Sequence, residues 1–374
     1  MADMDIRVSK ILVHPIKSCR GTSVQESRYT PEGLEHDRRF CIVEADSHKV
    51  ITAREVAKMV LITPRIHEDS SSTHGGVLTI SFPEDSGCAS FSVPLFPVGF
   101  EDKWERVNDI ELWGTTIDGF ICQSIFNSPS ASVDVGANAN ANARADSDVD
   151  VDAKTNIDAN VDANVDVNVN AGASASAILS KYMDRPVHLV VKGSTPRSCD
   201  PTDTFPKLKA TARYQDCYPL LVLSEESMGV VKEEVGRWGG FAGDGGDEGD
   251  GGGRVAGIGE EWKGRDVVIE RFRPNIVIRG AGPFAEDHFE EVSIGGSSEG
   301  ILLVSKCARC LLPNVSPDTG VRDKAVPYKV LMKFRTGVDP LNKMKPCVGC
   351  HGVPLGNGTI RVGDEVFVKK MIVA

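Results

Sequence analysis

The sequence lacks the features that mark membrane-spanning, secreted and nucleic-acid-binding proteins. Its longest apolar runs, such as residues 301–304, have the length of a strand, whereas a membrane helix needs about 20 apolar residues. The N-terminus is acidic where a secretory or mitochondrial leader would be basic. The formal net charge of −11 argues against binding to nucleic acid. We therefore expect a cytoplasmic protein with no membrane span and no nucleic-acid partner, and the sequence does not support a mitochondrial association.

Several catalytic motifs are missing as well. The sequence contains no Walker loop, no nucleophile elbow and no His-Glu-x-x-His motif, so it offers no support for P-loop, serine-hydrolase or zinc-protease chemistry. Ten cysteines are present, and the cytoplasm keeps thiols reduced. A cysteine with a role in this protein is therefore expected to act as a thiolate or as a metal ligand.

Two tracts hold the whole net charge. Residues 128–177 are mostly Ala, Val, Asp and Asn without an aromatic residue, and residues 240–261 are rich in Gly and Asp. Such compositions bury too little apolar surface to fold, so we predict a disordered insertion over 127–177 and a flexible loop over 240–261. A calcium loop over 148–159 is disfavoured, because alanines stand where that loop needs glycine and glutamate.

The rest of the chain predicts a mixed α+β protein that is predominantly β. Short runs rich in Val and Ile alternate with turn residues before the insertion, as in a small barrel. After the insertion come further strands, a helix that Ser224 would cap, and a hairpin at Asn357-Gly358. We expect one β-barrel domain over 1–126 and a second β domain over 178–374.

The densest cysteine clusters are two Cys-x-x-Cys pairs, Cys307 with Cys310 and Cys347 with Cys350. Two such pairs can hold one zinc ion, although the 36 residues between them exceed the usual spacing of about 15–20. His351 directly after the second pair also completes the attachment motif for c-type haem, but this interpretation is disfavoured because such haem is attached in exported proteins and no leader is visible. The remaining possibility is that the second pair is incidental to a glycine-rich loop.

Cations and a hydroxyl gather near the N-terminus. Lys17, Ser18 and Arg20 follow a proline turn, and Arg38 precedes the next strand. Such side chains form a receptor for phosphate, because charge-assisted and bidentate hydrogen bonds favour that anion. Surface charge without a ligand is the alternative that spacing alone leaves open.

A set of short motifs follows one order along nearly the whole chain outside the two acidic tracts. The motifs are His14-Pro-Ile-Lys-Ser-Cys, Gly33-Leu with Asp37-Arg38 and Phe40, Ile51-Thr-Ala-Arg54, Leu223-Ser-Glu-Glu-Ser-Met, Phe272-Arg-Pro-Asn-Ile-Val-Ile, Ala285-Glu-Asp, Arg309-Cys310 with Ser316-Pro-Asp-Thr-Gly320, and Val362-Gly-Asp-Glu-Val. This series resembles the MOSC superfamily, and more narrowly proteins such as the mitochondrial amidoxime-reducing components. The resemblance implies a MOSC N-terminal β-barrel domain packed on a MOSC β-barrel domain.

The resemblance also implies a molybdenum cofactor, in which a pterin dithiolene carries a phosphate and one protein thiolate completes the ligands of the metal. The matching thiolate is Cys310, the predicted metal ligand and catalytic residue, and Arg309 beside it would help to keep the thiol ionised. The residues that match family positions around the phosphate, the pterin and the cleft are Lys17, Ser18, Arg38, Arg273 and Asn275. Pyridoxal phosphate binding is a further property associated with the family.

The chain departs from the family pattern near the expected pocket. Asp216-Cys217-Tyr218 stands where relatives have Asp-Thr-Ser, and Pro313-Asn-Val-Ser316 where they have Thr-Thr-Val-Asp. Asp216 is still expected as an acidic catalytic residue, and Tyr218 is expected to reach the cofactor or to narrow the pocket. Because hydroxyl donors to the pterin are altered, we expect the substrate preference to differ.

The implied function is that of a molybdenum-cofactor-dependent oxidoreductase that reduces amidoximes, N-hydroxylamines and similar small N-oxygenated substrates. The sequence offers no convincing site for flavin or haem, so electrons are expected from a separate partner. The resemblance suggests a cytochrome b5-type protein and its reductase. The alternative is a carrier module for the molybdenum cofactor or for sulfur, of the kind found in cofactor sulfurases.

Overall fold

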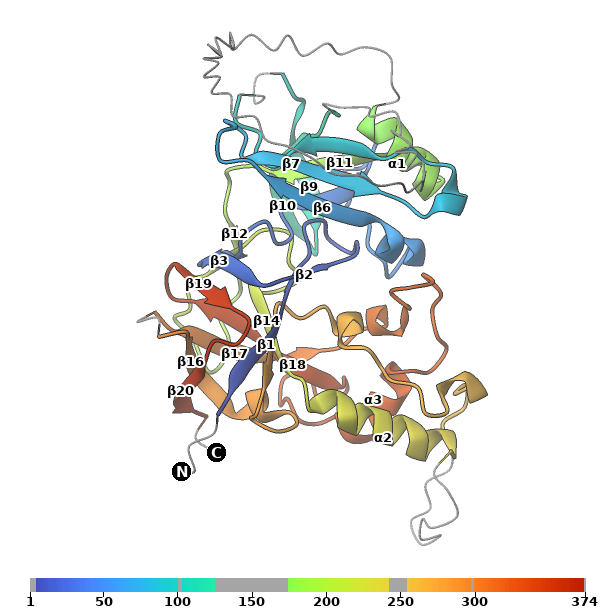
Figure 1. Cartoon of the computed structure of the whole chain (residues 1–374), viewed down its shortest axis with the longest axis vertical. Coiled ribbons are helices and arrows are strands. Elements are labelled where there is room, and N and C mark those ends of the chain that lie inside the picture. The colour runs from blue at the N-terminus through green and yellow to red at the C-terminus, as the bar shows by residue number, and fades with distance from the viewer. Residues whose placement is uncertain (1–4, 100–102, 125–173, 242–253, 297–298, 373–374) are drawn as a thin grey trace, which may run out of the picture.

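The computed structural model describes residues 5–99, 103–124, 174–241, 254–296 and 299–372. These residues form two β-rich bodies, one above the other in Figure 1, with twenty strands and three α-helices. The expected mixed fold with a predominance of β-structure is therefore confirmed. Most of the predicted insertion, including the calcium-like stretch, lies outside the described residues. In the described part of the chain, no helix is long and apolar enough to cross a membrane.

The first body consists of two antiparallel sheets that share one apolar core, and residues of the four-stranded sheet also form a second apolar cluster. The four-stranded sheet has the order β5 (Phe40–Glu44), β11 (Val187–Lys192), β10 (Thr115–Ile121) and β9 (Arg106–Leu112), and the three-stranded sheet has β6 (Thr63–Glu68), β7 (Gly76–Ser81) and β8 (Phe91–Pro94). Helix α1 (Ala175–Met183) buries Leu179 and Met183 in this core, and the Ser174 hydroxyl accepts the Ala177 N–H at its first turn.

The second body is built on an eight-stranded sheet. Its order is β2 (Thr22–Val24), β1 (Arg7–Val13), β15 (Ile276–Arg279), β14 (Leu220–Ser224), β18 (Cys347–Pro354), β17 (Ile301–Ala308), β16 (Phe289–Ile294) and β20 (Val366–Met371). Residues of the small sheet of β19 (Gly358–Arg361), β3 (Glu26–Thr30) and β4 (Gly33–Leu34) share one apolar core with this sheet, and residues of α2 (Ser227–Gly239) and α3 (Tyr328–Phe334) share another. A two-stranded ladder joins β12 (Arg197–Ser198) to β13 (Thr211–Ala212).

The chain crosses between the two bodies more than once. Strand β1 lies at the start of the sequence but pairs with β15 of the second body, where Figure 1 shows it in dark blue. Strand β11 comes after the insertion but pairs with β5 of the first body. The predicted division into 1–126 and 178–374 therefore separates segments that pair with each other. Strand pairing satisfies backbone groups without regard to sequence order, and this accounts for the exchange.

Two local expectations are wrong. Ser224 ends β14 instead of capping α2, because its hydroxyl donates to the Gly282 carbonyl at 2.7 Å. The Asn357-Gly358 step does not form a hairpin with β18, because β19 pairs with β3. In both cases a partner distant in sequence takes the hydrogen bonds that a local motif would have used.

The predicted flexible loop over 240–261 is ordered in its described second half. Val255 is buried in the core that α2 and α3 share, and a 3₁₀ helix at Glu260–Trp262 buries Trp262 there. Val255 lies inside the Gly/Asp-rich tract, whose average composition conceals it, and Trp262 follows directly after the tract. Residues 242–253 lie outside the described part.

Candidate active site

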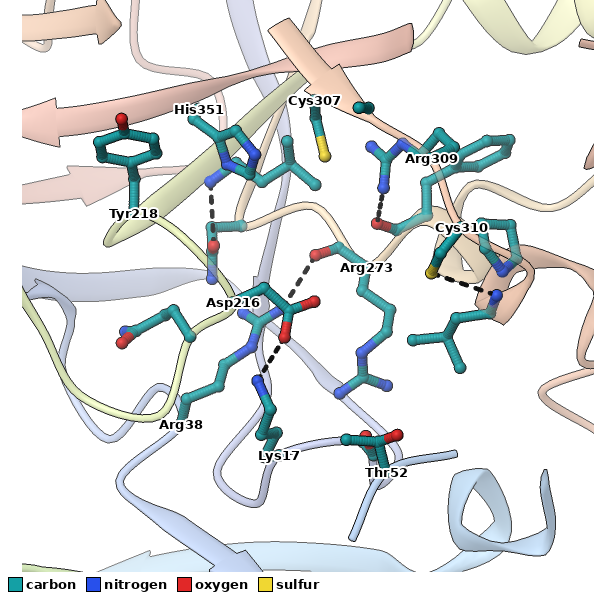
Figure 2. Close-up of a pocket in the computed structure, with 18 of the residues that line it drawn as sticks. Lys17, Arg38, Thr52, Asp216, Tyr218, Arg273, Cys307, Arg309, Cys310 and His351 are labelled. Carbon is teal, nitrogen blue, oxygen red and sulfur yellow. Dashed lines mark hydrogen bonds and ion pairs between the residues drawn. The ribbon is translucent and has the colours of Figure 1, made fainter. Parts of the chain in front are cut away.

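A cavity where the two bodies meet collects the predicted site residues (Figure 2). It encloses about 780 Å³ of space between atoms, counting its open mouth. All nine predicted residues line it: Lys17, Ser18, Arg38, Asp216, Tyr218, Arg273, Asn275, Arg309 and Cys310. Segments that are up to 293 positions apart in the numbering thus meet only in the folded protein.

Three of the lining residues have a backbone conformation that side chains other than glycine rarely adopt. The φ angles are 68° at Ser18, 45° at Arg38 and 56° at Arg273. Hydrogen bonds hold this geometry, such as the one from the Arg38 N–H to the His14 carbonyl at 2.7 Å. Left-handed positions of this kind cost free energy and concentrate at ligand sites. Their grouping here makes this cavity the candidate functional site.

The orientation of Arg38 is set by a buried carboxylate. Arg38 Nη1 donates to both oxygens of Asp37 at 2.7 and 2.8 Å, and its Nη2 donates to the Arg273 carbonyl at 3.1 Å. Asp37 is fully buried and also accepts the His14 backbone N–H at 2.9 Å. Burial alone would raise the pKa of Asp37, but the charge of Arg38 and the bonds from His14 lower it to about 2. Asp37 therefore stays ionised and fixes Arg38.

Buried hydrogen-bond donors line the cavity without partners in the described structure. Arg273 donates from Nη1 to the Cys19 carbonyl at 2.7 Å, while its Nη2 has no partner. The Thr52 hydroxyl and Arg271 Nε, whose residues also line the cavity, are likewise buried without a hydrogen-bond partner. Burial, and secondarily the charge of Arg38, lowers the pKa of Arg273 to about 10. A buried donor without a partner costs about 1–3 kcal/mol, so a bound anion would satisfy these groups.

Cys310 lies in the loop directly after β17 and lines the cavity. Its half-buried Sγ accepts the Leu312 backbone N–H at 3.4 Å and Arg54 Nε at 3.2 Å. The sequence prediction paired Cys310 with Arg309, but Arg309 donates to the carbonyls of Val348 and Phe272 instead. Arg54 therefore contacts the sulfur, and the sequence analysis missed it. Its place in the Ile51-Thr-Ala-Arg54 motif was the available signal.

Asp216 is an anchor for the cations of the cavity. It pairs with Lys17 Nζ, and its second oxygen accepts Arg54 Nη2 at 2.9 Å. Desolvation would raise the pKa of Asp216, but the charges of Lys17 and Arg54 outweigh it and hold the pKa far below its usual range. An ionised carboxylate has no proton to donate at neutral pH. Asp216 is therefore suited to positioning Lys17 and Arg54.

Asn275 and Tyr218 line the cavity but use their polar atoms elsewhere. Asn275 Oδ1 accepts the Leu221 N–H at 3.1 Å, and its Nδ2 donates to the Leu12 carbonyl at 3.2 Å, which ties β1 to the segment before β15 and to β14. The Tyr218 hydroxyl donates to the Asp200 carbonyl at 2.8 Å, and the ring packs beside His351 with centroids 5.4 Å apart. Tyr218 therefore contributes its ring to the cavity wall, and its two expected roles stay predictions.

The two cysteine pairs do not form a zinc site. Within the described residues, no group of three cysteines brings its sulfurs within 4.8 Å of one another. Cys350 Sγ donates to the Glu286 carbonyl at 3.2 Å, and Cys347 pairs with Ala308 in the β17–β18 ladder. The strands therefore place these sulfurs in separate surroundings. Cys307 and Cys310 both line the cavity, but only Cys310 lies in the loop after β17.

Comparisons with known proteins agree with this architecture. The family model for the MOSC N-terminal beta barrel domain matches residues 5–128, and that for the MOSC domain matches residues 209–367. The chain is 26% identical over 369 residues to mitochondrial amidoxime-reducing component 1 of Mus musculus and 25% identical over 367 residues to component 2 of Rattus norvegicus. Each alignment covers 96% of this chain and 82% of the relative.

Among solved structures, the YUAD protein from Bacillus subtilis covers 46% of this chain and 74% of its own, at 10% identity and a TM-score of 0.22. That superposition is too loose to support a statement about the fold. The two domain models and the alignments over 96% of the chain are mutually consistent. The chain belongs to the MOSC family, with a MOSC N-terminal β-barrel domain followed by a MOSC domain.

Proposed function

We propose that this protein is a molybdenum-cofactor-dependent oxidoreductase that reduces small N-oxygenated compounds such as amidoximes and N-hydroxylamines. The proposal rests on one observation: the half-buried Cys310 thiol faces a cavity lined by buried cationic and hydroxyl donors without partners. The similar proteins, which are named amidoxime-reducing components, support the class of reaction.

The residues present fit such a cofactor. A soft thiolate suits a sulfur-rich metal centre, so Cys310 would hold the metal. Lys17, Ser18, Arg38 and Arg273 would hold the phosphate and the pterin, because they line the cavity and the Nη2 group of Arg273 lacks a partner. The bound cofactor supplies the two-electron chemistry.

The overall reaction takes an amidoxime, two electrons and two protons to an amidine and water. Within this reaction, Asp216 keeps Lys17 and Arg54 in place, and Arg54 holds the Cys310 sulfur. The buried cavity walls exclude bulk water from the reacting centre. We propose that the electrons come from a separate cytochrome b5-type protein with its reductase. The expected cytoplasmic location and pyridoxal phosphate binding stay predictions.

The first experiment is an analysis of metal and pterin content. The protein would be purified from a host that makes molybdenum cofactor, and molybdenum, zinc and iron would be measured together with pterin fluorescence after release. We expect near-stoichiometric molybdenum and pterin. Zinc without molybdenum would contradict the proposal. Release of intact cofactor to an acceptor protein, without reduction of any amidoxime, would favour the carrier alternative.

The matched variants Cys310→Ala and Cys307→Ala test the metal ligand. Both cysteines line the cavity and lie three positions apart, but only Cys310 contacts Arg54. We expect Cys310→Ala to abolish amidoxime reduction, whereas Cys307→Ala keeps most of it. Full activity in Cys310→Ala would show that the site is assigned wrongly. Molybdenum content separates loss of the ligand from loss of the fold, which circular dichroism reports.

A further inference from the structure

The hairpin of β9 and β10 places a strained aromatic residue at the mouth of the site. Leu112 pairs with Thr115, so Trp113 and Gly114 form its two-residue turn. Their φ angles are 53° and 79°, as in a type I′ turn, which favours Asn-Gly. A tryptophan at the first position is costly there, because bulky side chains avoid positive φ. A residue kept in such a conformation points to a role other than turn formation.

Trp113 contacts the charged residues of the site directly. The Arg54 guanidinium lies 4.5 Å from the centre of the ring, and Lys17 Nζ lies 5.8 Å from it. The indole Nε1 also donates to Asp216 at 3.3 Å. Arg54 in turn donates to the Cys310 sulfur. Arg54 therefore lies between Trp113 of the first body and Cys310, the proposed metal ligand, and contacts both.

Beyond the inner cavity lies a wider hollow, here called the outer chamber, which encloses about 2070 Å³ including open solvent. The two spaces share Arg54, Asp216, Cys310 and His351 in their walls. Trp113 lines the outer chamber only, and half of its surface is exposed there. Trp113 and Cys310 therefore lie in the wall of the same chamber.

We propose that Trp113 is a substrate-positioning residue, whose exposed indole face stacks on a flat aromatic substituent of an N-oxygenated substrate in the outer chamber. The inference rests on the proposed function and adds a preference for aryl over alkyl substrates. Cation–π contacts with Arg54 and Lys17 hold the ring in place, so little side-chain freedom is lost when a ligand stacks on it. Aromatic stacking favours offset or tilted rings and discriminates against aliphatic groups.

The decisive variants are Trp113→Asn and Trp113→Phe in the molybdenum-loaded protein. Asparagine suits the turn, so Trp113→Asn should fold with an unchanged or higher melting temperature while it loses the ring. We expect the KM for benzamidoxime to rise about 3- to 10-fold, in line with the typical strength of an aromatic pair, with little change for acetamidoxime. Trp113→Phe should retain most of the discrimination. An equal change for both substrates, or no change, would overturn the proposal.

A binding measurement gives a readout that needs no turnover. Benzamidine, a flat amidine, should quench the tryptophan fluorescence of the wild type, and acetamidine should not. The quenching should vanish in Trp113→Phe, because Trp104 and Trp262 are buried and Trp238 lies on α2. If no N-oxygenated compound is reduced but this quenching is found, the proposed function is wrong, while the stacking of aromatic ligands on Trp113 is confirmed. If amidoximes are reduced but neither the quenching nor the discrimination depends on Trp113, only the stacking on Trp113 is contradicted.

Discussion

At the residue scale, the site depends on cations that ionised carboxylates hold in place, one of them buried and the other exposed at the mouth of the cavity. Asp37 shows this most clearly, because it is fully buried and still ionised beside Arg38. Asp216 does the same for Lys17 and Arg54 at the mouth of the cavity. Two carboxylates therefore hold the cations that a phosphate-bearing cofactor would meet.

Asp37→Asn is expected to destabilise the protein at neutral pH. The pKa of Asp37 falls from 3.8 to about 2 on folding, so ionisation favours the folded state by about 2 kcal/mol above pH 4. Because the folded pKa is the lower one, this contribution is lost as the pH falls from about 4 to about 2. Thermal unfolding at pH 7 and pH 3 measures the difference, with the exposed Asp203→Asn as control. A constant difference between wild type and variant at both pH values would contradict this account.

At the element scale, the short 3₁₀ helix η5 (Ala285–His288) carries an acid in an unfavourable place. Glu286 is fully buried beneath β14 and β18, and in the described structure neither side-chain oxygen has a hydrogen-bond partner. Burial raises the pKa of Glu286 from 4.5 to about 7. The next residue, Asp287, avoids this cost because it pairs with Arg335.

Glu286→Gln is expected to stabilise the protein at alkaline pH. The folded pKa is the higher one, so the wild type loses stability as the pH rises from about 4.5 through about 7. The gain in the variant should therefore grow from near zero below about pH 4 to about 3 kcal/mol at pH 8.5, as an upper bound. Melting temperatures across this range measure it, and Glu84→Gln in the exposed helix η2 (Glu84–Ser86) is the control. A gain in stability that does not depend on pH would contradict the claim that ionisation of the buried Glu286 destabilises the fold.

At the scale of the whole molecule, the two bodies depend on strands that they exchange. Strand β1 completes the large sheet beside β15, and β11 lies between β5 and β10 in the four-stranded sheet. Removing either strand would leave unpaired backbone groups at a sheet edge that is otherwise covered. The site also needs both bodies, since Trp113 comes from one and Cys310 from the other.

Fragments 1–126 and 178–374 are therefore expected to fail to fold when each is expressed alone. The first lacks β11 and α1, and the second lacks β1. Expressed together, they should assemble, because the missing strands are then supplied by the partner fragment. Size-exclusion chromatography and circular dichroism distinguish these results. A soluble fragment 178–374 with a cooperative melting transition would show that the exchanged strand β1 is dispensable.

The sequence by itself determined the β-rich class, the family motifs and the set of residues that the cavity brings together. Apolar periodicity and turn residues are local properties, and motifs such as His14-Pro-Ile-Lys17 can be identified without knowledge of the tertiary structure. Only the tertiary structure decided the pairing of β1 with β15, the packing of Val255, and the contact of Arg54 rather than Arg309 with Cys310. These features depend on neighbours far apart in the chain. Donors from distant segments compete for the same buried acceptors, and a local sequence pattern does not show which donor binds.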